Sequence, residues 1–211
     1  PEVLAQAIYA FLDEAGALPE CPHTVPEFEK DAVAASFSRA ASAYDSVAQL
    51  QRRVGERLLT YLDARPGKPA RVLDLGCGPG NSARMMREAG LEVDASDASP
   101  EMVAIAKERH GVNARLERFE DLTAQDLYDG IWANFSLLHA PRADMPRHLA
   151  AIHKALKTGG LLHLGLKTGE TEERDEAGRF YVYYSEPVLL DLLKDAGFKL
   201  NTSRHGEMPG L

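Results

Sequence analysis

Residues 72–83, VLDLGCGPGNSA, combine the residue types best suited to hold a ligand against the main chain. An aliphatic run containing Asp74 leads into three glycines spaced by two, and helix-favouring residues follow. Glycine adopts backbone angles that side chains forbid and lets a ligand approach closely. Asp97 closes the next apolar run, where a carboxylate could accept both hydroxyls of a ribose. The pattern predicts a nucleoside-containing ligand at the end of a buried strand.

Two ligand classes use such a loop, dinucleotides and S-adenosylmethionine. Residues 78–83 satisfy the G-x-G-x-x-A dinucleotide fingerprint, which is weak evidence when it stands alone. The carboxylate of Asp74, two residues before the first glycine, would repel a pyrophosphate but attract the ammonium group of S-adenosylmethionine. The spacing therefore favours S-adenosylmethionine, and an NAD-dependent oxidoreductase is the alternative.

Strand and helix patterns alternate around this loop and would position it. An N-cap Ser-Pro pair opens a helix at 99–100 that Gly111 closes. Such alternation predicts an α/β fold with a doubly wound, mostly parallel sheet, which binds ligands outside the carboxyl ends of its strands. The strands are expected at 71–76, 91–96, 113–119, 128–135, 161–167 and 198–203, and the helices at 81–89, 100–110, 144–157 and 187–197.

Apolar residues recur at helical spacing over 2–15 and 37–62, with a proline-containing loop between them. The chain is expected to form a single domain, 1–211, with residues 1–64 as a helical cap and 168–185 as a lid-like insertion. The acidic stretch 170–176, ETEERDE, is expected to be a solvated loop.

Composition limits the function classes. The chain has 211 residues, 45% hydrophobic and 27% charged, which is enough for one well-buried domain. Its net charge of -8 and the lack of a basic stripe disfavour a nucleic-acid substrate. The first residues lack the basic region of a secretory leader. No window approaches the ~18 apolar residues of a membrane span. The two cysteines, Cys21 and Cys77, make neither a disulfide framework nor a metal cluster. A cytoplasmic protein without a membrane partner is expected, as a monomer or a homodimer.

The stretches VLDLGCGPGNSA, VDASDASPEM, YDGIWANFSLLHAP and ALKTGGLLHL together resemble the class I S-adenosylmethionine-dependent methyltransferases. The similarity is greatest to the small-molecule branch that includes quinone- and biotin-pathway enzymes. It covers residues 37–201 and is strongest over 72–167. It implies S-adenosylmethionine as cofactor, S-adenosylhomocysteine as product, and in-line methyl transfer to a small-molecule acceptor. The family usually closes its sheet with an antiparallel seventh strand, for which the residues after 201 show no convincing pattern.

The resemblance also implies roles for individual residues. The glycine loop would line the amino-acid half of the cofactor, Asp97 would hold the ribose, and residues 119–120 would meet the adenine edge, where the family more often has Asp-Ala. The cofactor-binding residues so implied are Asp74, Gly76, Cys77, Gly78, Gly80, Asp97, Ala98, Met102, Phe119, Glu120, Ala133, Phe135 and Leu138.

Catalytic and acceptor-binding candidates each have a structural alternative. By resemblance Tyr44 lies near the sulfonium, or it is one apolar position of its helix. His139 is a candidate general base, a role typically worth about 10²–10⁴ in rate, or it hydrogen-bonds the next loop. Lys167 could meet an acidic substrate, although a loop-capping role is favoured. The substrate candidates, placed on the acceptor side or in a strand with one face in the core, are Arg179, Tyr181 and Tyr183.

No metal site is expected, because His153, His163 and His205 have no cysteine or carboxylate at ligand spacing. Asn134 does not begin the Asn-Pro-Pro-aromatic motif of many nucleic-acid amino methyltransferases. A non-catalytic S-adenosylmethionine-binding module is a further alternative, and a missing acceptor pocket would favour it.

Overall fold

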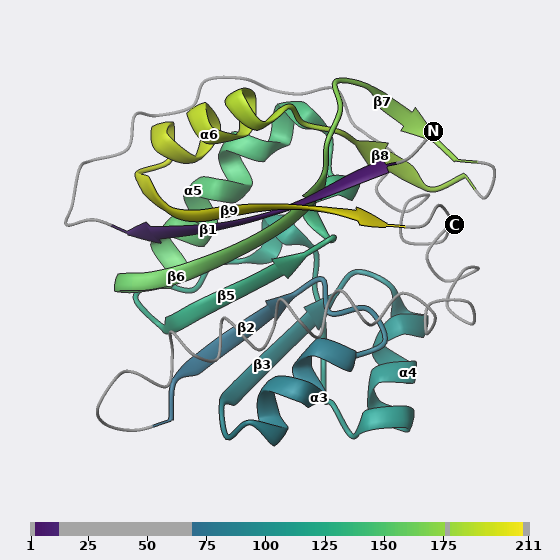
Figure 1. The fold of residues 1–211 in the computed structure, drawn as a ribbon. Coiled ribbons are helices and arrows are strands. Elements are labelled where there is room, and N and C mark those ends of the chain that lie inside the picture. The colour runs from purple at the N-terminus through teal and green to yellow at the C-terminus, as the bar shows by residue number, and fades with distance from the viewer. Residues whose placement is uncertain (1–2, 13–68, 176–177, 209–211) are drawn as a thin grey trace.

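The computed structural model describes residues 3–12, 69–175 and 178–208, in which one seven-stranded sheet has the order β4-β3-β2-β5-β6-β1-β9 (Figure 1). The five strands from β4 to β6 are mutually parallel, and β1 runs antiparallel between β6 and β9. The prediction of a doubly wound, mostly parallel sheet is confirmed. The strands are β1 (Val3–Leu12), β2 (Arg71–Leu75), β3 (Glu92–Asp97), β4 (Arg115–Leu116), β5 (Tyr128–Asn134), β6 (Leu156–Lys167) and β9 (Phe198–Met208).

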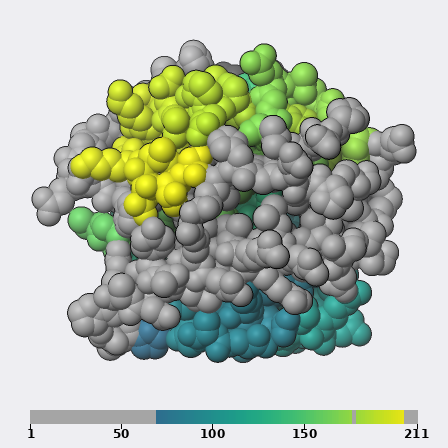
Figure 2. Space-filling view, viewed as in Figure 1, coloured from purple at the N-terminus to yellow at the C-terminus, as the bar shows by residue number. Residues whose placement is uncertain are grey.

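Helices cover the two faces of the sheet. Val72 of β2 packs in one cluster with Met86, whereas its neighbour Leu73 packs in another with Leu149 and Leu189. Because successive strand residues point to opposite faces, the two clusters lie on opposite sides of the sheet. The helices, which Figure 1 shows as one pair on each side, are α3 (Asn81–Glu88) and α4 (Pro100–His110), and α5 (Met145–Ala155) and α6 (Glu186–Asp195). In Figure 2, the yellow atoms of α6 and β9 lie at the upper left, and the blue and teal atoms of the segment from β2 to α4 lie along the lower edge.

Local signals explain how α4 begins and ends. The Ser99 hydroxyl accepts a hydrogen bond from the Met102 N–H at 3.3 Å, Pro100 occupies the first turn, and Gly111 ends the helix with φ of 62°. These are the cap residues that the sequence predicts. The helix therefore starts directly after Asp97 and its neighbour Ala98, which fixes the loop at the carboxyl end of β3.

The N-terminal segment corrects the prediction. Residues 3–12 form strand β1 and not part of the helix expected over 2–15, and β1 is hydrogen-bonded to a neighbouring strand on each side. A short apolar run suits a buried strand as well as a helix, so periodicity alone could not separate them. This strand supplies the antiparallel seventh strand, and the residues after 201, for which no strand was predicted, continue β9 to Met208 beside it. The rest of the predicted cap, with Tyr44, lies outside the described residues.

Residues 168–185 contain a second, two-stranded sheet of β7 (Glu172–Arg174) and β8 (Phe180–Val182). The expected acidic loop is therefore partly a strand, although β7 is exposed as predicted. A bridge between Thr168 and Tyr184 holds this small sheet at the carboxyl end of β6. Of the strand expected over 113–119, only residues 115–116 pair with β3.

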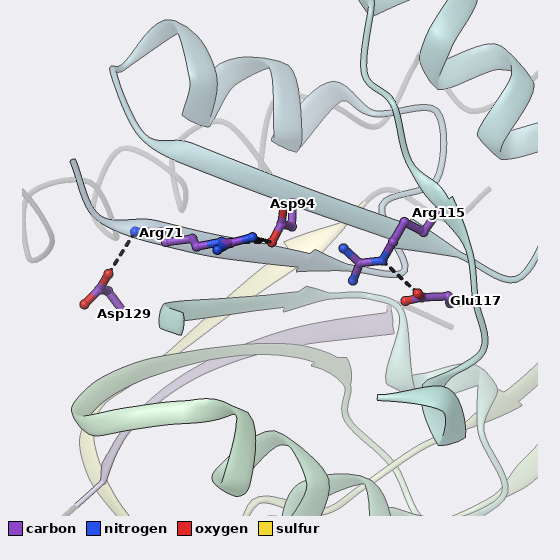
Figure 3. A network of polar contacts seen from close by, with 5 residues as sticks. All are labelled: Arg71, Asp94, Arg115, Glu117 and Asp129. Atoms are coloured by element: carbon purple, nitrogen blue, oxygen red, sulfur yellow. Dashed lines mark hydrogen bonds and ion pairs between the residues drawn. The ribbon is translucent and has the colours of Figure 1, made fainter. Parts of the chain in front are cut away.

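One ion pair joins two neighbouring parallel strands and a second lies within the β4 segment (Figure 3). Arg71 pairs with Asp94 at 2.8 Å, and its main-chain N–H donates to Asp129 at 2.9 Å. Arg115 pairs with Glu117, two residues further along the same segment, at 2.7 Å. Partly exposed pairs are worth about 0–1 kcal/mol each, so the main effect of the Arg71 contacts is to favour one register of β2 against its neighbours.

Candidate functional site

A pocket lies at the carboxyl ends of β2, β3 and β5, where the fold predicts a ligand. It brings together most of the residues predicted for the site, from the glycine loop, the end of β3, residues 119–120 and the segment after β5. The predicted residues that line it are Asp74, Gly76, Cys77, Gly78, Asp97, Ala98, Met102, Phe119, Glu120, Phe135 and His139.

Other predicted residues do not line this pocket. Ala133 and Leu138 are buried in the core on the α5 face. Arg179, Tyr181 and Tyr183 lie in and beside β8, behind the pocket-lining His139. Gly80 has φ of +86°, and a Cβ there would lie 3.0 Å from the Cβ of Ala106, so its task is to let α3 pack against α4.

Asp97 holds the glycine loop. Its Oδ2 accepts the Gly78 N–H at 2.8 Å and its Oδ1 accepts the Ser99 N–H at 2.9 Å. Burial raises the pKa of Asp97, while these backbone hydrogen bonds act in the opposite direction. Gly78 has φ of +53° and no heavy atom within 4 Å of a Cβ added to it, so its main chain faces open space. A ligand can therefore approach the loop beside a carboxylate that the backbone already orients.

Asp74 is a buried carboxylate whose Oδ2 has no hydrogen-bond partner. Burial, then the charge of Asp97, raise the pKa of Asp74 to about 8, and a hydrogen bond from the Ala83 backbone partly opposes them. A buried carboxylate oxygen left unpaired is costly unless a cation or a donor meets it. Asp74 therefore offers a place for a positively charged group.

Two polar side chains beside Asp74 were not predicted from the sequence. Asn134 and Ser136 both line the pocket, and the amide Nδ2 of the first and the hydroxyl of the second are buried without hydrogen-bond partners. His163 Nε2 lies 3.0 Å from Asn134 Oδ1. In the tautomer protonated at Nε2, His163 donates a hydrogen bond to this oxygen, so the amide N–H groups of Asn134 remain for a ligand.

Further features hold Asn134 in place. The His163 ring stacks on Trp132 with centroids 3.8 Å apart, and burial lowers the pKa of His163 to about 3, so the ring is neutral. Gly165 leaves room for Asn134, whose side-chain oxygen would overlap a Cβ at that position. Phe135 follows with φ of 54°, an uncommon conformation for a bulky residue. The segment after β5 is thus shaped around the pocket.

The arrangement can bind a zwitterion. Asp74 presents an unpaired acceptor, while Asn134 and Ser136 present unpaired donors, so a ligand with both an ammonium and a carboxylate satisfies all three. A ribose beside Asp97 would use the remaining lone pairs of that carboxylate. The amino-acid and ribose parts of S-adenosylmethionine fit this set.

His139 is neutral and held in place. Its Nδ1 lies 2.6 Å from the Phe180 carbonyl oxygen, and its ring meets the Tyr181 ring edge-on at 4.7 Å. Burial lowers the pKa of His139 to about 3, although the Phe180 carbonyl favours the charged form. A base this weak removes a proton poorly at neutral pH. The histidine is hydrogen-bonded as one of the two predictions has it, but its partner is a carbonyl of strand β8 and not the next loop.

The remaining pocket residues extend it toward α5. Asp144 and His148 are buried there, and His148 meets Phe119 edge-on at 5.6 Å. In the described ranges no three His, Cys, Asp or Glu side chains come together as metal ligands would. Among the same residues no helix has the length and apolarity needed to cross a membrane.

A family profile described as a methyltransferase domain matches residues 72–160, the segment from β2 into β6. Two curated relatives are malonyl-[acyl-carrier protein] O-methyltransferases. The one from Pectobacterium atrosepticum is 37% identical over 153 residues, covering 71% of this chain and 59% of its own length. The one from Serratia marcescens is 39% identical over 150 residues, covering 70% and 58%. This chain thus spans less than two thirds of these relatives.

Solved structures agree on the fold. The Burkholderia thailandensis 1,6-didemethyltoxoflavin-N1-methyltransferase, solved with its acceptor and S-adenosylhomocysteine, has a TM-score of 0.64 and 26% identity, with 85% of this chain and 82% of that chain covered. The DhpI–S-adenosylhomocysteine complex has a TM-score of 0.59 and 24% identity, with 85% and 96% covered.

Proposed function

Because this chain belongs to the class I S-adenosylmethionine-dependent methyltransferases, we propose that it transfers a methyl group from S-adenosylmethionine to a small-molecule acceptor. One observation carries the proposal. Asp74, which is buried in β2, and Asp97, which is partly buried at the end of β3, flank an open glycine loop and line the same pocket. A pyrophosphate would meet the unpaired oxygen of Asp74 unfavourably, which argues against the NAD-dependent alternative.

The chain's own residues would bind and orient both reactants. Asp74 would accept the ammonium of the cofactor, Asn134 and Ser136 would donate to its carboxylate, and Asp97 would hold its ribose. The bound cofactor supplies an electrophilic methyl group on a sulfonium. Holding the acceptor at attack distance can account for about 7–11 kcal/mol of a barrier, so the protein needs little covalent chemistry.

His139 would position the pocket wall and not accept a proton. Its neutral ring ties the segment after β5 to β8 through the Phe180 carbonyl. The residue thus connects the pocket to residues 168–185, the segment proposed as a lid, whose closure over a bound acceptor would exclude water.

The acceptor class and the setting are part of the same proposal. The net charge of -8 supports a small molecule over a nucleic acid, and a cytoplasmic monomer or homodimer without a membrane partner is the simplest form of the enzyme. The curated relatives are named for a malonyl group on a carrier protein, so acids belong in any acceptor screen.

The test is transfer of a radiolabelled methyl group from S-adenosylmethionine to fractionated small metabolites. We expect label in at least one fraction, and a rate at limiting cofactor that falls about tenfold or more in Asp97→Asn, since one charged hydrogen bond is worth about 1.5–3 kcal/mol. The matched control is Asp94→Asn, on the same strand but paired with Arg71. Tight S-adenosylhomocysteine binding with no label in any fraction would instead support a non-catalytic binding module.

A further inference from the structure

Residues 139–144, here called the wall, lie between the pocket and the small sheet of β7 and β8. The wall residues that line the pocket are His139, Ala140, Pro141 and Asp144. Arg142, in the same stretch, begins a single 3₁₀ turn and directs its side chain to residues 168–184, here called the hairpin. A ligand in the pocket would therefore be separated from the hairpin by the wall alone.

The guanidinium of Arg142 contacts both arms of the hairpin. Its Nη2 donates to the carbonyl oxygen of Tyr183 and, at 3.2 Å, to that of Glu170. Its Nε lies 3.5 Å from Glu172 Oε1, and its central carbon lies 4.6 Å from the centroid of the buried Tyr184 ring. A planar group with five N–H donors suits contacts in several directions. One side chain of the wall thus holds the arm before the hairpin turn and the arm after it.

A second attachment joins the same two segments. His139 Nδ1 lies 2.6 Å from the Phe180 carbonyl oxygen, and because a carbonyl only accepts, the nitrogen donates. Within the hairpin the Tyr183 N–H donates to the Thr171 carbonyl oxygen at 3.0 Å, so the two arms are themselves joined. With attachments at His139 and Arg142, the wall cannot shift without moving the hairpin.

The hairpin is suited to respond to such a shift. Its first strand, β7, is exposed along its length. Elements with little buried surface open at a low cost in free energy, so a small change in their attachment alters how often they are ordered.

Resting on the proposed function, we propose that Arg142 is a positioning residue that couples the hairpin to the pocket. A ligand held against the wall orders the hairpin, and the ordered hairpin holds the wall against the ligand. Coupling between two sites is reciprocal, so the factor by which the ligand stabilises the hairpin is the factor by which the attached hairpin raises ligand affinity. Typical couplings are about 5–150-fold.

The first test is amide hydrogen exchange, measured by mass spectrometry with and without S-adenosylhomocysteine. In the wild type we expect exchange over 168–175 and 178–184 to slow about fivefold or more when the ligand binds. Arg142→Gln should abolish this slowing, while residues 76–80 of the glycine loop stay protected by the ligand. Arg142→Lys, which keeps the charge but not the fork of donors, should keep part of it.

Arg174→Gln is the matched control, because it makes the same change in charge on the same hairpin. Arg174 donates to the Gly178 carbonyl oxygen at 2.9 Å and lies 5.5 Å from the Phe180 ring centroid, both contacts within the hairpin. This variant should keep the full response to the ligand.

The second test is the affinity for S-adenosylhomocysteine, measured by calorimetry, which Arg142→Gln should lower by the factor that the exchange loses. A purely structural role predicts instead that Arg142→Gln speeds hairpin exchange equally with and without ligand and leaves the affinity unchanged, and this result would overturn the proposal. If Arg142→Gln does not fold, a complete wild-type response in Arg142→Lys would overturn it.

The same measurements separate this proposal from the proposed function. S-adenosylhomocysteine binding to the wild type without any change in hairpin exchange would remove the coupling alone. Failure of the wild type to bind S-adenosylhomocysteine would remove the proposed function itself.

Discussion

Asp74 is a buried carboxylate and Asp97 is a partly buried one, and their hydrogen bonds differ. Asp97 has backbone N–H partners on both oxygens, so it is ionised at lower cost and orients the glycine loop. Asp74 keeps one oxygen unpaired, so its ionised form is disfavoured until a cationic group binds there. Asp97 therefore shapes the site before a ligand binds, whereas Asp74 responds to the ligand.

The raised pKa of Asp74, about 8, makes binding depend on pH. An ammonium ligand requires the ionised carboxylate, so S-adenosylhomocysteine affinity should rise from pH 6 to pH 8 and level off above. Binding at pH 7 should release close to one proton. Calorimetry at that pH in two buffers with different ionisation enthalpies measures the release.

The same group affects folding in the unliganded protein. The folded pKa lies above the ordinary value of 3.8, so the folded state binds more protons, and the stability from Asp74 falls as pH rises between about 4 and 8. The melting temperature of Asp74→Asn minus that of the wild type should therefore be larger at pH 8.5 than at pH 5. Wild-type and variant curves that keep the same separation at both pH values would show that Asp74 is not buried as described.

Sequence reasoning reached the acidic residues and the glycines but missed Asn134 and Ser136. Asp74 and Asp97 stand out because a carboxylate at a strand end beside glycines is rare in a plain core. At the end of β5 the prediction chose Ala133, one residue from Asn134, and a shift of one residue along a strand moves a side chain to the other face. Asp74 lines the pocket and pairs with Trp132 of β5. Because every second residue of a strand faces the same side, this register would have indicated Asn134, two residues after Trp132.

At the scale of elements, the contact between α3 and α4 fixes the glycine loop, and Gly80 is its closest point. A Cβ at Gly80 would lie 3.0 Å from the Cβ of Ala106, and φ of +86° already disfavours a side chain. Gly90 has a similar φ of +88° but no atom within 4 Å of the same position.

Gly80→Ala should therefore lower the free energy of unfolding more than Gly90→Ala does. The Gly90→Ala change measures the backbone strain alone, which is about 1–2 kcal/mol. The extra overpacking at Gly80 is typically ~1–3 kcal/mol, or roughly 2–4 °C in melting temperature for each kcal/mol in a domain of this size. Urea denaturation of both variants gives the comparison. Equal destabilisation by the two changes would mean that α3 and α4 do not pack closely at this point.

The elements that the sequence predicts well are those whose ends are marked by capping residues, prolines or glycines. Helix α4 has its serine cap, its proline and its closing glycine, and it begins within one residue of the expected position. Strand β1 has no such marks, and its state depends on pairing with β6 and β9, which are more than 140 residues away in sequence. A segment whose structure is decided by such distant partners cannot be assigned from its own spacing.

At the scale of the whole molecule, the parallel strands bring β2, β3 and β5 to one edge, so residues 60 positions apart, such as Asp74 and Asn134, share a pocket. The small sheet of β7 and β8 then places Tyr181 against His139, which lines the pocket. The pocket thus has polar side chains from β2, β3 and the segment after β5 on one side, and His139, backed by an aromatic ring of β8, on another.

The most direct test of this account is isothermal calorimetry of the whole chain with S-adenosylhomocysteine and, in parallel, with NAD. We expect saturable one-to-one binding of S-adenosylhomocysteine, weakened about tenfold or more by Asp97→Asn, and no measurable heat with NAD. Because ~1.4 kcal/mol corresponds to a factor of ten, such a change is well within the range of the method. Tight binding of NAD with no binding of S-adenosylhomocysteine would contradict the assignment of this pocket.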